Sequence, residues 1–120
     1  VSHDALLSDL ADDPDLAELV AHFVSSLDGK MANLRARFAS SDMSELAMLA
    51  HQLKGAGGGY GFPTISEAAR RLETSVKEGE AREGMATALN ELAAICDRAM
   101  AGRRQFELTA ADLQVSEHTL

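Results

Sequence analysis

The sequence has few of the residues that crosslink, break or stiffen a chain. Its 120 residues include one cysteine, two prolines, one tyrosine and no tryptophan. A single cysteine, Cys96, excludes an internal disulfide and suits a reducing compartment. Sparse proline, with a hydrophobic fraction carried by alanine, leucine and methionine, favours helix throughout. We therefore predict an all-α protein with a single folded domain.

Positive charge and long apolar runs are also lacking. The formal net charge is −8, which argues against a nucleic-acid surface, and no basic stripe offsets it. No apolar run approaches the ~20 residues that span a membrane, and no signal peptide is visible. We expect a cytoplasmic protein with neither nucleic-acid nor membrane partners. The sequence leaves open whether the chain is free-standing or part of a longer protein.

Apolar residues at helical spacing are abundant. They predict four long helices, over about 14–40, 42–60, 64–79 and 80–106. A short additional N-terminal helix is predicted over 2–11. Long amphipathic helices joined by short breaks favour an antiparallel up-down four-helix bundle, and a core of that size is self-sufficient in a monomer. We place this domain at residues 1–107 and a C-terminal tail or linker at 108–120.

Capping residues mark where three of these helices begin. Asp13 followed by Pro14 predicts the start of the first long helix. Asp42 and Glu45 have the spacing of a capping box and predict the start of the second. Residues 64–67 form a further capping box, which predicts the start of the third.

The stretch over residues 46–73 predicts a helical hairpin with its apex at 61–63. His51 lies two residues, about 200°, from the nearest leucines of the inner apolar stripe, so it faces outward. Gly55 and Gly58 share its face, although each costs the helix roughly 1 kcal/mol relative to alanine. We interpret these glycines as clearance, because they leave the imidazole open to the active site of another protein.

Counting from the apex predicts which side chains meet across the hairpin. His51 lies eleven residues before Phe62 and Glu73 lies eleven after it, so the two should share one height. Lys54 and Arg70 are each eight residues from the same point. We expect Glu73 to hydrogen-bond a ring nitrogen of His51, and Lys54 and Arg70 to bracket the outer end of this face.

A known motif runs through this hairpin: His51-x-Leu53-Lys54-Gly55, then Gly61, then Leu72-Glu73. It resembles the signature of the histidine phosphotransfer (HPt) domain, a four-helix bundle whose exposed histidine carries a phosphoryl group between aspartates of receiver domains. The resemblance implies that His51 is the phosphoacceptor through an exposed Nε2, that Lys54 neutralises the phosphoryl oxygens and that Glu73 orients the imidazole. It also implies response regulator receiver domains as partners.

Catalytic machinery for making a phosphohistidine is absent from the sequence. It has no Walker loop, no glycine-rich loop after a strand, and no acidic cluster suited to hold Mg²⁺ beside His51. We expect a phosphocarrier rather than an enzyme, with no cofactor or metal bound by this domain. The Mg²⁺ ion that such transfers use is expected on the partner receiver domain.

A docking surface is expected around the phosphoacceptor. Such surfaces are apolar at the centre and polar at the rim. The candidates on the hairpin are Ala47, Met48, Gly55, Gly58 and Arg70, and further apolar candidates are Met43, Leu6, Leu7 and Leu10.

Three other functions compete with a phosphorelay carrier. Gly61-Phe62 also resembles the phosphoacceptor domain of chemotaxis-type kinases, so the domain could serve a chemotaxis-type or hybrid sensor histidine kinase. A separate ATP-binding domain, in the same or another chain, would then phosphorylate His51. A di-metal bundle enzyme would need inward Glu-x-x-His pairs, which the sequence lacks. A pure scaffold would leave the cleared face around His51 unexplained.

Overall fold

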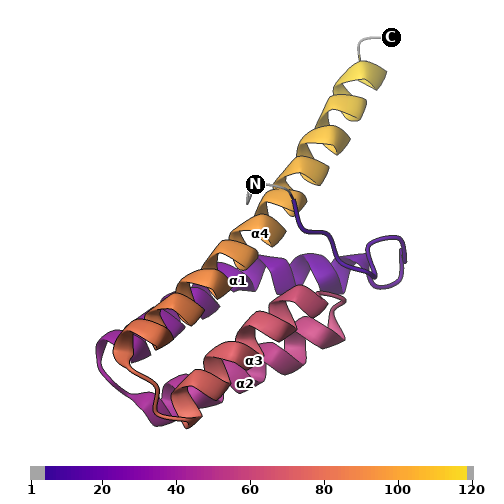
Figure 1. Ribbon diagram of the computed structural model, residues 1–120. Helices are drawn as coiled ribbons and strands as arrows, with labels where there is room; N and C mark the ends of the chain where they lie inside the picture. The colour runs from indigo at the N-terminus through magenta and orange to yellow at the C-terminus, as the bar shows by residue number, and fades with distance from the viewer. Residues whose placement is uncertain (1–4, 119–120) are drawn as a thin grey trace.

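The computed structural model describes residues 5–118, with side chains through Gly102. Its described part is all-helical and contains four helices, which confirms the predicted class (Figure 1). They are α1 (Ala17–Ala39), α2 (Met43–Gly59), α3 (Pro63–Lys77) and α4 (Arg82–His118). Each of α1 and α3 packs against both α2 and α4, so the four helices form a ring around one core.

The helix pair α2–α3 is the tight hairpin that the sequence predicts, and Figure 1 shows its two arms side by side. Gly61 at the apex has φ +83°, a conformation that favours glycine. The Phe62 amide donates to the carbonyl of Gly57 at 2.8 Å, which closes the turn. The Phe62 ring is buried and packs on Phe23 of α1, with 5.8 Å between ring centroids. The apex is therefore fixed to the bundle, and it sets the register of both arms.

The core follows the apolar stripes of the four helices. All four helices contribute large buried side chains, among them Leu27, Leu34, Leu46, Ile65, Leu72, Leu89 and Leu92. Cys96 is buried as well, and burial raises the pKa of its thiol to about 12. It therefore packs as a small hydrophobic residue.

The predicted N-terminal helix over 2–11 is wrong for the residues that the structure describes, since residues 5–11 contain no helix. Residues 2–4 lie outside the described part. The segment is tied to the bundle instead: the Leu6 amide donates to the Arg98 carbonyl at 3.0 Å, and the Asp9 amide donates to the Gly61 carbonyl at 2.7 Å. The Ser8 hydroxyl donates to the Tyr60 carbonyl at 2.6 Å. These contacts replace the backbone bonds that a helix would have made.

Two helix starts differ from their predictions. Helix α1 begins at Ala17, because Asp13 caps a preceding turn, where its side chain accepts from the Asp15 amide at 2.9 Å. Helix α3 begins at Pro63 with no side-chain cap, so the capping box predicted at 64–67 is wrong. The capping box of α2 is confirmed in part, since the Asp42 side chain accepts from the Glu45 amide.

Helix α4 runs further than its sequence pattern indicated. It continues to His118, through most of the segment predicted as a tail or linker, and projects beyond the ring of helices (Figure 1). Residues 103–118 contain neither glycine nor proline, so nothing in that segment breaks a helix. Residues 119–120 lie outside the described part, and the domain boundary at 107 stays a prediction.

Candidate functional site: an imidazole held by a buried carboxylate

His51 lies on the outer face of α2. The inner face of this helix is buried through Leu46, Ala50, Leu53 and Gly57. The His51 side chain is 63% exposed. The helical period therefore places the imidazole outside the core, as the sequence predicts.

Glu73 reaches His51 from the neighbouring helix α3. Its Oε2 lies 2.9 Å from Nδ1 of the imidazole, which confirms the contact predicted by counting from the apex. Unlike His51, the Glu73 side chain is only 6% exposed. A buried carboxylate needs charged or hydrogen-bonding partners, since an unpaired buried charge is costly.

Two lysines supply the remaining partners of Glu73. Lys54 of α2 places Nζ 3.0 Å from Oε1, and Lys77 of α3 places Nζ 2.9 Å from Oε2. The hydrogen bond from Lys77 lowers the pKa of Glu73 most, and those from Lys54 and His51 lower it further, against the opposing effect of burial. Together they hold the pKa of Glu73 at about 2.

The ionisation of Glu73 fixes the tautomer of His51. An ionised carboxylate only accepts hydrogen bonds, so Nδ1 of the neutral imidazole must carry the proton and donate it. Nε2 is then left with a free lone pair on an exposed ring. An imidazole in this state can act as a nucleophile toward an electrophile from outside.

The glycines around His51 divide into two kinds. A Cβ at Gly55 would meet no atom within 4 Å, and one at Gly58 would only reach the Ser66 side chain at 3.6 Å. A Cβ at Gly57 would lie 3.0 Å from both Ile65 Cγ2 and the Ser66 amide nitrogen. Gly57 therefore permits close packing of α2 on α3, whereas Gly55 leaves open space on the His51 face.

The expected bracket of Lys54 and Arg70 forms only in part. Lys54 joins the site through Glu73, but Arg70 pairs with Glu67 on its own helix, where Nε donates at 2.9 Å. Lys77, which the sequence analysis did not single out, is the second lysine at the carboxylate of Glu73. Sequence reasoning missed Lys77, although its position four residues after Glu73 is the spacing of a helical ion pair.

The remaining docking candidates occupy different places. Ala47 and Met43 are half-buried and Met48 is exposed on α2. The N-terminal segment contains the other candidates, Leu6, Leu7 and Leu10. Backbone hydrogen bonds join this segment to α4 and to the hairpin apex, and the apex is about ten residues along the chain from His51.

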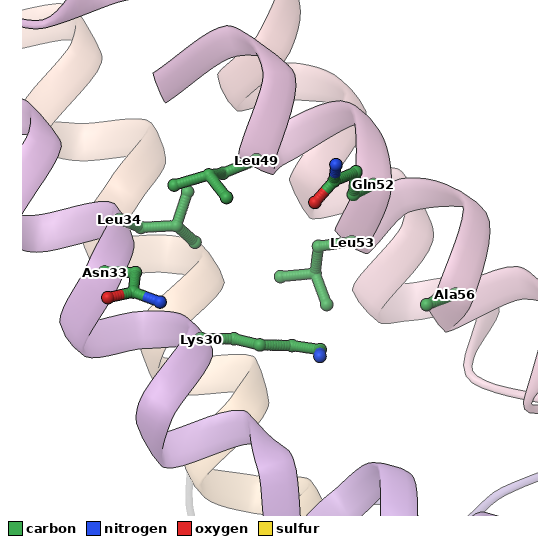
Figure 2. A pocket seen from close by; sticks show the side chains of 7 residues that line it. All are labelled: Lys30, Asn33, Leu34, Leu49, Gln52, Leu53 and Ala56. Carbon is green, nitrogen blue, oxygen red and sulfur yellow. The ribbon is translucent and has the colours of Figure 1, made fainter. Parts of the chain in front are cut away.

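A groove between α1 and α2 was not foreseen from the sequence. Its cavity has a volume of about 260 Å³ and is lined by Lys30, Asn33, Leu34, Leu49, Gln52, Leu53 and Ala56. Figure 2 shows the Lys30 side chain extending from α1 across the groove toward α2. No periodicity in one helix could have indicated it, because the groove depends on how two helices pack.

Features of two other kinds of protein are missing from the described residues. These residues contain no group of three or more His, Cys, Asp or Glu side chains that could hold a metal ion. In the same part of the chain, no helix combines the length and apolar character needed to cross a membrane.

Comparison with known proteins gives one match. The family model described as "Hpt domain" matches residues 18–113, which is most of the chain and includes His51, Lys54, Glu73 and Lys77. No curated protein and no solved structure matched in the other two comparisons. The family match agrees with the all-helical fold and with the motif around His51, and the chain therefore belongs to the Hpt domain family.

Proposed function

We propose that this chain is a phosphocarrier of a phosphorelay, in which His51 accepts a phosphoryl group from the aspartyl phosphate of one receiver domain and passes it to another. Membership of the Hpt family supports a phosphotransfer role in general. The observation that supports His51 as the acceptor is its exposed ring, whose Nδ1 lies 2.9 Å from a buried carboxylate.

The proposed transfer balances as a displacement at phosphorus. Nε2 of His51 attacks the phosphoryl group, a nitrogen–phosphorus bond forms, and the bond to the aspartate oxygen of the receiver breaks. The proton on Nδ1 stays on the ring, and Glu73 accepts a hydrogen bond from it. The negative charge of Glu73 offsets the positive charge that develops on the ring. Lys54, about one turn from His51 on the same helix, neutralises the phosphoryl oxygens.

Most of the catalysis comes from the partner in this proposal. Phosphoryl transfer depends on positioning and charge neutralisation, usually with Mg²⁺. The receiver supplies the Mg²⁺ and the acidic pocket, and this chain supplies a nucleophile and a docking face. Ala47, Met48, Gly55 and Gly58 form the centre of that face, and Arg70 lies at its rim.

A second candidate is the phosphoacceptor domain of a chemotaxis-type or hybrid sensor histidine kinase. The Gly61-Phe62 apex favours it by resemblance, and the chemistry at His51 is the same. The phosphoryl donor differs, since ATP bound to a separate kinase domain would replace the aspartyl phosphate. Incubation with such a kinase domain and ATP distinguishes this function from transfer by receivers.

The test is phosphoryl transfer from a panel of phosphorylated receiver domains in the presence of Mg²⁺. We expect the wild-type chain to become labelled by at least one receiver, and His51→Gln to abolish the label because the nucleophile is gone. Circular dichroism should show unchanged helix content, since the side chain is exposed. Labelling that survives in His51→Gln would rule out His51 as the acceptor.

A further inference from the structure

The carboxylate of Glu73 has more positive partners than it needs. The ammonium groups of Lys54 and Lys77 both contact this one buried carboxylate, and Nδ1 of His51 is a third hydrogen-bond donor to it. One ammonium could leave and the carboxylate would still be neutralised by the other. The site therefore holds a spare positive charge in a chain whose formal net charge is −8.

The two lysines are held differently. Lys54 has Oε1 to itself, its side chain is 33% exposed, and its backbone carbonyl accepts from the Ser66 hydroxyl at 2.8 Å. The Lys77 side chain is 64% exposed and shares Oε2 with Nδ1 of His51. Lys77 is thus the more weakly confined of the two lysines.

The two lysines also lie on opposite sides of His51 along the hairpin. Lys54 is about one turn from His51 toward the apex, and Lys77 is about one turn from Glu73 away from the apex. A phosphoryl group on His51 would add close to two negative charges between them. The long, flexible stem of a lysine lets its ammonium follow such a charge.

We propose that Lys77 is an exchangeable counter-ion: Glu73 holds its ammonium while His51 is unmodified, and the ammonium moves to the phosphoryl oxygens once His51 is phosphorylated. Lys54 keeps its contact with Oε1, so Glu73 stays neutralised, while the other N–H donors of the Lys54 ammonium face the phosphoryl oxygens from the apex side. The departure of Lys77 leaves Oε2 to the Nδ1 proton alone, at the stage when the ring carries its positive charge. This inference rests on the proposed function of His51.

The exchange stabilises the phosphorylated form of His51 relative to the aspartyl phosphate of a receiver. The size expected is that of one partly exposed ion pair, which corresponds to about two- to fivefold in an equilibrium constant. Lys77 therefore sets how much phosphoryl group rests on this chain rather than on its partner.

The test measures the ratio of phosphorylated His51 to phosphorylated receiver at equilibrium, with a receiver that labels the wild-type chain. We expect Lys77→Met to lower this ratio about two- to fivefold, and Lys77→Arg to restore it. Arg71→Met is the matched control, because it removes the same charge from an exposed position of the same helix. An unchanged ratio in Lys77→Met, or an equal loss in Arg71→Met, overturns the proposal.

A second measurement separates this proposal from the function on which it rests. Phosphoramidate is added to the isotope-labelled wild-type chain, and the side-chain resonances of Lys77 are followed by NMR, with Arg71 as reference. Phosphorylation of His51 should shift the Lys77 resonances and leave those of Arg71 in place. If His51 is labelled while Lys77 does not respond, the exchange is wrong. If His51 is labelled by neither phosphoramidate nor any receiver, the proposed function itself fails.

Discussion

Helix α3 carries two ion pairs that look alike in sequence and differ in their surroundings. Glu67 is 53% exposed and pairs with Arg70, three residues later on the same helix. Glu73 is 6% exposed and contacts Lys77 on its own helix, as well as His51 and Lys54 on α2. The hydrogen bond from Arg70 lowers the pKa of Glu67, but water surrounds that pair. The pKa of Glu73 is held at about 2 within the hairpin.

The difference shows how packing turns an ordinary helical ion pair into part of a site. An exposed pair is screened by solvent and contributes little, so either partner can be lost at small cost. A buried carboxylate has no water to replace a lost partner, so the loss of one partner leaves its charge uncompensated and is costly. The α2–α3 hairpin encloses Glu73 beside His51 and leaves Glu67 exposed on the outside of α3.

The largest expected effect is on phosphoryl acceptance by His51. Glu73→Gln replaces a carboxylate by an amide that can either accept from or donate to Nδ1, so the tautomer is no longer fixed. At metal sites, loss of the partner that orients a metal-binding histidine typically lowers affinity or activity tenfold to a hundredfold. We expect a loss of similar size in the rate at which His51 is labelled. Glu67→Gln is the matched control and should label at the wild-type rate. Equal rates in the two variants would mean that Glu73 does not orient the acceptor.

The next effect is on stability in acid. The folded pKa of Glu73 lies below its ordinary value of 4.5, at about 2, so its ionised form stabilises the fold. This contribution is complete above pH 4.5 and is lost as the pH falls toward 2. Across this range the free energy of unfolding of the wild-type protein should fall by on the order of 2 kcal/mol more than that of Glu73→Gln. Urea unfolding at stepped pH measures the difference.

The control for acid stability is again Glu67→Gln. Because that carboxylate is exposed, its removal should leave the pH dependence of the free energy of unfolding close to that of wild type. A Glu73→Gln protein that follows the wild-type curve down to low pH would show that burial and the two lysines do not act on Glu73 as the geometry indicates.

Sequence reasoning found the hairpin because its rules are local. The apolar period of α2 determines which of its residues face inward. Counting from the glycine apex then predicts that His51 and Glu73 lie at the same height and contact each other. The same counting missed Lys77, because it considered only residues at equal height. A lysine side chain spans more than one helical turn, so a position four residues away reaches the same carboxylate.

The other failures come from contacts that no local pattern contains. Ser8 bonds to the Tyr60 carbonyl, and this tertiary contact helps to hold the N-terminal segment out of a helix despite its leucines. The capping box expected at residues 64–67 does not form, and the hydroxyl of Ser66, which lies within that stretch, donates across the hairpin to the Lys54 carbonyl. The groove between α1 and α2 likewise arises from two helices together. Polar side chains choose partners in space, and those partners become known only after the helices have packed.

The smallest expected effects are on the free energy of unfolding, at two glycines of α2. Like Glu73 and Glu67 on α3, one of these positions is enclosed and the other is open. Gly57→Ala places a methyl group 3.0 Å from the Ser66 backbone nitrogen and from Ile65, and the backbone cannot easily move away. We expect a loss of about 1–2 kcal/mol in the free energy of unfolding. Gly55→Ala meets nothing within 4 Å and should stabilise α2 by about 1 kcal/mol, because alanine favours helix. Denaturant unfolding of both variants should therefore give changes of opposite sign, and a loss in both would mean that the surface beside His51 is more closely packed than its open space indicates.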